Sequence, residues 1–363
     1  MPTVTRILNF SSGPAVLPVP VLEQVQRDLL ALPGVGMSVM EISHRSSTFE
    51  GVLHKAESDI RTLANVPANY KVLFLQGGAS LQFSMVPLNL LTEGRTADYL
   101  MTGTWADKAA KEARRVGTVN ETGSTKADNY NRIPEPGEYA LTPGGAYVHI
   151  TSNNTIEGTQ WKTPPAAGDS PLVSDASSDI FSGPIDVAKY GVVYAGAQKN
   201  LGPSGVTLVI IREDLLARSS KSLHTMLNYA VHAENGSLYN TPPAFGIYVL
   251  GLVVDWLRAQ GGLDAMAAIN NRKAGKLYAE LDRTGFWRPT ARKDSRSLMN
   301  VTFRLASEEL EKAFAKESTA AGLDGLKGHR SVGGMRASIY NAFPESGVDT
   351  LVEFMREFER RNG

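Results

Sequence analysis

Short apolar runs rich in β-branched residues alternate along most of the chain with longer stretches whose apolar residues recur at helical spacing. The apolar runs predict strands, and the periodic stretches between them predict helices. This alternation favours an α/β fold with a mostly parallel sheet that is sandwiched by helices. The predicted strands are 71–75, 96–101, 146–150, 172–175, 192–195 and 207–211, and the predicted helices are 53–65, 81–91, 104–116, 248–259 and 263–281.

The last part of the chain has a different pattern, in which two strands alternate with two helices and Gly322 ends the first of these helices. Such a pattern predicts a smaller C-terminal α+β domain. Pro87 lies inside a predicted helix of the large domain, so we expect a kink or an early end there. The elements of the tail are 296–305, 308–321, 335–339 and 348–361. The expected domains are 16–257 for the large unit, and 1–15 with 258–363 for the small one.

Composition excludes several classes of function. The chain has 37 basic and 37 acidic residues, so it has no overall positive charge that would attract nucleic acid. No apolar run is long enough to cross a membrane, and no secretory signal precedes the first predicted element. The chain has no cysteine, which excludes disulfides, thiolate metal sites and cysteine nucleophiles. The absence of cysteine also fits a cytoplasmic protein, which is the location we expect. The histidines lack metal-ligand spacing, so we expect no metal site.

A lysine and an aspartate each follow a predicted buried strand. Lys199 lies in a loop with small neighbours after the run 192–195, and Asp175 ends the run 172–175. A lysine after a strand is usually a solvated surface residue, and an aspartate there is often a turn residue. Together they form the pair that pyridoxal phosphate needs, because an amine binds its aldehyde and a carboxylate keeps its ring nitrogen protonated. The pair therefore predicts a pyridoxal phosphate enzyme.

Two further segments suit such a cofactor. The run Gly77-Gly78-Ala79-Ser80 lies between a predicted strand and a predicted helix, where backbone N–H groups and a hydroxyl can bind a phosphate. This run alone is equally typical of a tight turn, and it matches neither a dinucleotide-binding nor a Walker A motif. Trp105 follows the strand 96–101 and could stack on a planar ring, although a place in the core is equally compatible with its position.

Two His-Arg pairs lie in Gly- and Ser-rich loops, at His44-Arg45 and at His329-Arg330. Either pair alone would be read as surface residues. Arginine binds carboxylate and phosphate with two parallel hydrogen bonds, and histidine adds a donor of adjustable charge. Both pairs together suggest a substrate with two anionic groups.

Long motifs in the same order make the chain similar to the phosphoserine aminotransferases, a group of class V aminotransferases within the fold-type I pyridoxal phosphate enzymes. The resemblance runs nearly from end to end, which makes it far more specific than any single motif. It rests on Asn9-Phe10-Ser11-Ser12-Gly13-Pro14, Ser43-His44-Arg45-Ser46, Phe74-Leu75-Gln76-Gly77-Gly78, Asn154-Thr155-Ile156-Glu157-Gly158, Ser174-Asp175-Ala176-Ser177, Ala197-Gln198-Lys199-Asn200, Tyr239-Asn240-Thr241-Pro242 and Gly328-His329-Arg330-Ser331 through Arg336.

The resemblance implies how the cofactor, pyridoxal 5'-phosphate, is held. The implied contacts are Lys199 for the covalent bond and the later proton transfer, Asp175 for the ring nitrogen, Trp105 for stacking, Thr155 for the ring hydroxyl, and Ala79, Ser80, Gln198, Asn240 and Thr241 for the phosphate. As in dimers of the family, Asn240 and Thr241 would come from the neighbouring subunit. Some members have Gly-Arg where this chain has Ala79-Ser80, so the phosphate contact here would depend on N–H groups and a hydroxyl.

The resemblance also implies the reaction. Glutamate would give its amino group to 3-phosphohydroxypyruvate, forming phosphoserine and 2-oxoglutarate in serine biosynthesis. Arg336 would bind the α-carboxylate of either substrate. His44 and Arg45 would bind the distal anion together with His329 and Arg330, which would arrive from the partner chain of a homodimer with shared active sites.

Three alternatives remain open at this stage. Many bacterial members of the group also form 4-phosphohydroxy-L-threonine in pyridoxine biosynthesis. A small-amino-acid:glyoxylate aminotransferase of the same class would share Lys199 and Asp175 but would not need two His-Arg pairs. A non-catalytic binding protein with this fold could have lost Lys199 or Asp175, whereas this chain retains both.

Overall fold

A seven-stranded sheet forms the centre of the computed structural model, which describes residues 6–363. All neighbouring pairs are parallel except those that β10 makes with β2 and β9. The expected mostly parallel sheet is therefore confirmed, with one reversed strand. In spatial order the strands are β2 (Tyr70–Leu75), β10 (Thr207–Arg212), β9 (Val192–Gly196), β8 (Leu172–Asp175), β5 (Val148–Thr151), β3 (Thr96–Leu100) and β4 (Thr118–Thr122).

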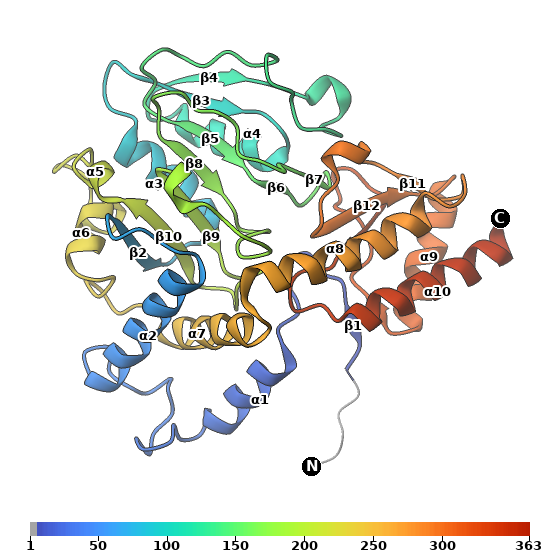
Figure 1. Cartoon of the computed structure of the whole chain (residues 1–363), viewed down its shortest axis with the longest axis horizontal. Helices are drawn as coiled ribbons and strands as arrows, with labels where there is room; N and C mark the ends of the chain where they lie inside the picture. The colour runs from blue at the N-terminus through green and yellow to red at the C-terminus, as the bar shows by residue number, and fades with distance from the viewer. Residues whose placement is uncertain (1–5) are drawn as a thin grey trace.

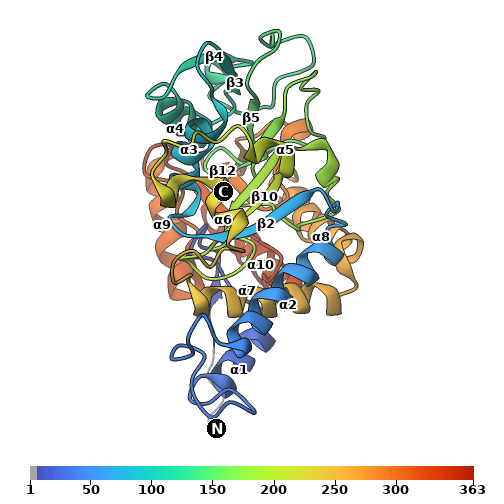
Figure 2. The same cartoon turned by 90° about the vertical axis from the view of Figure 1, so that its left-hand side faces the viewer.

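Helices cover both faces of this sheet, as Figures 1 and 2 show. The side chains of each strand alternate between the two faces: Val193 packs on one side, and Val192 and Tyr194 on the other. The first side is covered by α2 (Ser47–Leu63) and α7 (Ala244–Ala259), the second by α3 (Gly78–Leu90), α4 (Thr104–Ala113), α5 (Glu213–Leu216) and α6 (Tyr229–Glu234). The buried strands therefore read as continuous apolar runs in the sequence.

The long helix α8 (Gly262–Leu281) leads from this sheet into a second core (Figure 1). Phe10, Trp287, Phe314 and Phe358 contribute aromatic side chains to that core. The N-terminal β1 (Leu8–Asn9) joins it by pairing in parallel with β13 (Leu323–Asp324). The other elements of this part are a three-stranded sheet of β11 (Arg288–Pro289), β12 (Asn300–Arg304) and β14 (Met335–Ser338), with α9 (Glu308–Ala320) and α10 (Glu345–Asn362). None of the helices in residues 6–363 could span a membrane.

Several element ends differ from the sequence prediction for local reasons. Helix α2 begins before residue 53, because the Ser46 side chain accepts a hydrogen bond from the N–H of Phe49 and caps the helix. Helix α3 continues past Pro87 to Leu90 and ends where the Leu91 N–H donates to the Pro87 carbonyl. Strand β12 is shorter than 296–305, since the Ser297 hydroxyl accepts the N–H groups of two residues that follow it.

Several elements of the structure were not predicted. Strand β4 lies at the edge of the large sheet and is mostly polar, so it lacks the apolar run that marked the other strands. Helix α1 (Val19–Asp28) extends with the segment that follows it away from the body of the molecule (Figures 1 and 2). A two-stranded ribbon of β6 (Asn153–Asn154) and β7 (Thr159–Gln160) is also new, and it carries residues of the site described next.

Candidate active site

A cavity of about 300 Å³ lies where β8 and β9 end and α3 and α4 begin. The carboxyl ends of parallel strands lie on one edge of a sheet, so loops that are distant in the sequence meet here. The lining residues include Gly77, Gly78, Ala79, Ser80, Trp105, Asp175, Ser177, Gln198 and Lys199. The structure thus brings together six of the residues that were predicted to bind the cofactor.

Lys199 lies in the loop between β9 and β10. Its Nζ donates a hydrogen bond of 2.9 Å to the Thr155 hydroxyl and lies 5.0 Å from the centre of the Trp105 ring. Burial lowers the pKa of Lys199, and the Asp175 carboxylate acts in the opposite direction. The positive charge of Arg336 lowers this pKa further. An amine with a lowered pKa is better suited to exchange protons near neutral pH than a free lysine is.

Asp175 ends β8 and is only 5% exposed. Its Oδ1 accepts hydrogen bonds from the Ser177 N–H at 3.0 Å and from the Ser177 hydroxyl at 2.6 Å. Within residues 6–363, Oδ2 has no hydrogen-bond partner, and Asp175 lines the cavity. Burial raises the pKa of Asp175, whereas the charge of Lys199 lowers it. A carboxylate oxygen without a partner at a cavity fits a cationic N–H group, such as that of a protonated pyridine.

The first turn of α3 forms a cradle at the cavity, which is lined there by Gly78, Ala79 and Ser80. Gly77 precedes this helix with a φ of +84°, a conformation that favours glycine. The backbone of Gly196 lies beside the Ala79 N–H, since a Cβ atom on Gly196 would be in van der Waals contact with that nitrogen at 3.4 Å. Free N–H groups at a helix start attract phosphate, and Ser80 is exposed beside them. The lysine, the carboxylate, the indole and this cradle together fit pyridoxal phosphate.

Arg336 lines a second hollow of about 700 Å³ together with His329. Arg336 lies in β14, and its Nη1 donates to the carbonyl oxygen of Thr155 at 3.3 Å. Burial lowers the pKa of His329, as do the charges of Arg336 and Lys108. His329 therefore lies near Arg336 of its own chain. The expectation that the 329–330 loop serves the site of a partner is not tested by this, because the structure describes a single chain.

The other predicted residues do not meet in this chain. None of the hollows described for residues 6–363 is lined by His44 or Arg45, which belong to the segment between α1 and α2. Asn240 lines a smaller neighbouring hollow, and its Nδ2 lies 3.5 Å from Gln76 Oε1. Thr241 is exposed. Their contribution to the site stays a prediction.

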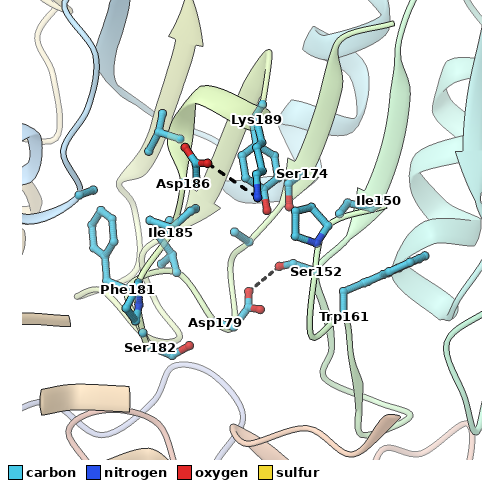
Figure 3. A pocket seen from close by; sticks show the side chains of 18 of the residues that line it. Ile150, Ser152, Trp161, Ser174, Asp179, Phe181, Ser182, Ile185, Asp186 and Lys189 are labelled. Atoms are coloured by element: carbon cyan, nitrogen blue, oxygen red, sulfur yellow. Dashed lines mark hydrogen bonds and ion pairs between the residues drawn. The ribbon is translucent and has the colours of Figure 1, made fainter. Parts of the chain in front are cut away.

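A third hollow, of about 610 Å³, is lined by the partly buried Asp179 (Figure 3). The Ser152 hydroxyl donates to Asp179 Oδ1 and also lies 3.0 Å from the Asp175 carbonyl oxygen. Burial raises the pKa of Asp179 to about 6. Asp186 and Lys189 form an ion pair of 3.8 Å at the same hollow (Figure 3). Sequence reasoning missed Asp179, although it follows Asp175 closely in the chain.

Comparison with known proteins agrees with this geometry. Residues 7–351 match the sequence profile described as aminotransferase class V. Phosphoserine aminotransferase of Geobacillus kaustophilus (strain HTA426) is 55% identical over 357 residues, which cover 98% of this chain and 99% of that protein. The solved structure of phosphoserine aminotransferase from Bacillus circulans subsp. alkalophilus is 53% identical and covers 99% of both chains with a TM-score of 0.97.

A pyridoxal-phosphate-bound phosphoserine aminotransferase from Trichomonas vaginalis is similar over 97% of this chain and 100% of its own, with 38% identity and a TM-score of 0.93. These relatives thus cover 97–99% of this chain. The chain therefore belongs to the class V aminotransferase family and, within it, to the phosphoserine aminotransferases, which are enzymes that use pyridoxal phosphate.

Proposed function

We propose that this enzyme transfers an amino group from glutamate to 3-phosphohydroxypyruvate and so forms phosphoserine and 2-oxoglutarate for serine biosynthesis. One observation carries the proposal: Thr155 contacts both Lys199 of the cavity and Arg336, which lines a hollow together with His329. The cavity suits the cofactor, and the hollow offers cationic groups for a substrate with two anionic ends. The names of the full-length relatives agree with this assignment.

Bound pyridoxal phosphate supplies an aldehyde that binds amines covalently and a ring that withdraws electrons from the carbon carrying the amino group. Lys199 Nζ would bind the aldehyde and afterwards move the proton at that carbon. Asp175 Oδ2 would hold the proton on the ring nitrogen, while Oδ1 stays fixed by Ser177. Trp105 would cover one face of the ring, and Thr155 would bond near its hydroxyl group.

The phosphate contacts follow from the cradle described above. Ala79 and Ser80 would offer N–H groups and a hydroxyl from the start of α3, and Gln198 would approach from the lysine loop. Asn240 and Thr241 would complete the phosphate site from a second copy of the chain. Their location outside the cavity of their own chain supports this part of the proposal.

Substrate binding would depend on cationic groups from two directions. Arg336 would hold the α-carboxylate, because its guanidinium is buried beside Thr155. His329 and Arg330 would bind the distal anion from the same chain, in view of the placement of His329. His44 and Arg45 would reach that anion from the partner subunit of a homodimer. The same cluster could accept either the carboxylate of glutamate or the phosphate of phosphoserine, which would let one pocket serve both half-reactions.

We also propose that the chain divides into a large domain over 16–257 and a small domain over 1–15 and 258–363. The pairing of β1 with β13 and the burial of Phe10 in the C-terminal core support this division. The small domain would then bring Arg336 to the edge of the large sheet.

The proposed function is tested by comparing amino acceptors with glutamate as donor. We expect 3-phosphohydroxypyruvate to be used far better than pyruvate or glyoxylate. A preference for glyoxylate would instead indicate an aminotransferase for small amino acids. We expect Lys199→Ala to fold but to lose several orders of magnitude in turnover, because the covalent partner and the proton carrier are lost together. Near-normal turnover of this variant would overturn the role of Lys199.

A further inference from the structure

The turn between β6 and β7 places a buried carboxylate at the start of α4. Glu157 is 7% exposed, and its Oε1 accepts two hydrogen bonds from Thr104, the first residue of that helix. The backbone N–H donates at 2.8 Å, and the hydroxyl donates at 2.7 Å. A carboxylate is favoured at a helix start because it satisfies a free N–H group and because it lies at the positive end of the helix dipole.

The fit around this carboxylate is close. A Cβ atom on Gly103 would lie 2.7 Å from Glu157 Oε2 and 2.7 Å from Asn154 Oδ1, so a side chain at this position would displace one of these groups. Oε2 itself is buried, and no residue within the described range 6–363 donates to it. Burial raises the pKa of Glu157, and the bonds from Thr104 lower it. The side chain is therefore held by one oxygen, at a single place on the helix.

The same turn is connected to both sides of Lys199. On one side, Thr155 accepts the hydrogen bond from Lys199 Nζ. On the other side, Trp105 directly follows Thr104, and the Lys199 nitrogen lies over its ring. The carboxylate of Glu157 thus fixes the backbone position of the residue next to the indole.

The turn is also tied to the C-terminal part of the chain. The Thr302 hydroxyl on β12 donates to the Glu157 carbonyl oxygen at 3.0 Å. Gly158 has a φ of +78°, and a Cβ atom on it would lie 2.1 Å from Thr302 Oγ1. Only glycine permits this approach. The β12 strand, the turn and the start of α4 are therefore in continuous contact.

We propose that Glu157 is a positioning residue for amino transfer. It holds the start of α4, and this keeps the Trp105 indole on one side of Lys199 while Thr155 lies on the other. The proposal rests on the proposed function in one respect, since it takes the Trp105 ring to cover the bound cofactor. Glu157 acts through Thr104 and Trp105, and it does not itself touch the amine of Lys199.

The test uses the cofactor-loaded enzyme and the variant Glu157→Gln, which keeps an oxygen acceptor but removes the charge. We expect the visible circular dichroism band of the bound cofactor to become clearly smaller, because this band reports how the ring is held. We also expect about a tenfold lower kcat, the size typical of a lost charge-assisted hydrogen bond, with little change in KM for the acceptor. Glu112→Gln, near the other end of the same helix, serves as the matched control and should change none of these values.

A second pair of variants keeps the test decisive if Glu157→Gln does not fold. Thr104→Ser retains the hydroxyl donor, whereas Thr104→Val removes it and leaves the backbone bond in place. We expect Thr104→Val to reduce the dichroism band and the quenching of tryptophan fluorescence on cofactor binding, and Thr104→Ser to restore both. Unchanged spectra in both Glu157→Gln and Thr104→Val would overturn the positioning role. If the unchanged enzyme itself bound no cofactor, the proposed function would fail instead.

Discussion

Replacing Lys273 with methionine tests how the segment behind the active site is held. Lys273 is fully buried on α8, and its Nζ donates to the carbonyl oxygens of Ile339, Tyr340 and Phe343 at 3.0, 2.7 and 3.1 Å. Asn341 follows Tyr340 in that segment, and its N–H donates to the side chain of Asn200, the residue after Lys199. Lys273→Met would keep most of the volume but leave three buried carbonyl groups without their donor.

Two opposing effects set the difference in stability between the unchanged enzyme and Lys273→Met: the lost hydrogen bonds and the cost of burying a charged amine. Each lost hydrogen bond costs about 1 kcal/mol, so the carbonyl groups alone predict a loss of about 2–3 kcal/mol in the free energy of unfolding. Burial, however, lowers the pKa of Lys273 from 10.5 to about 7. Between these values the unfolded chain binds a proton that the folded chain has released, so the stability of the unchanged enzyme rises with pH by at most about 1.4 kcal/mol per unit.

The assay is urea unfolding of the unchanged enzyme and of Lys273→Met at pH 6, 7, 8 and 9. Because methionine does not titrate, the stability advantage of the unchanged enzyme should be small at pH 6 and should grow by about 2–3 kcal/mol between pH 7 and 9. Lys276→Met removes an exposed ion-pairing lysine on the same helix, and its difference should stay flat over this range. A flat difference for Lys273→Met as well would refute the reasoning, since it would mean that the three carbonyl groups keep the amine charged.

Asp175→Asn should slow the proton-removal step in single-turnover experiments while cofactor binding through the phosphate survives, and an unchanged rate would contradict its role. When Lys199→Ala and Arg45→Ala subunits are mixed and allowed to exchange, about a quarter of the full activity should return, because half of the dimers are mixed and each of these has one intact site. Mixing Lys199→Ala with Arg330→Ala should restore nothing if both residues serve the site of the same chain, and recovery there would return the 329–330 loop to the partner. Gly158→Ala should lower the free energy of unfolding by about 2 kcal/mol or more, because it combines a left-handed φ with a clash, and an unchanged urea midpoint would refute this.

The sequence predicts the large sheet well because its strands are buried on both faces. The run Leu172–Asp175 has the same bounds in the structure as in the prediction. The reversed direction of β10 could not be predicted, since an apolar run looks the same whichever way the strand points. The polar edge strand β4 gave no apolar signal. The start of α2 depended on a cap at Ser46, which the apolar spacing did not reveal.

The residues of the site also divide into those that the sequence predicts and those that it does not. Lys199 and Asp175 could be predicted because each follows a strand end, and parallel strand ends meet on one edge of a sheet. Glu157 and Asp179 were missed because their importance depends on which helix or strand lies opposite, which is a property of the folded chain. The proposal that His329 serves the site of its own chain likewise depends on its position near Arg336, which the sequence does not give.

The antiparallel pairing of β9 with β10 has a consequence for how the lysine loop forms. The two strands are consecutive in the chain, and the loop between them is closed by a bond from the Ala197 N–H to the Val206 carbonyl oxygen. Closing a short loop costs little chain entropy, whereas the parallel pairs need long crossovers before they can meet. The hairpin can therefore assemble early, and the amide of Ala197 should be among the slowest to exchange with deuterium. Lys199 thus lies in the most local part of a sheet whose other contacts are mostly long-range.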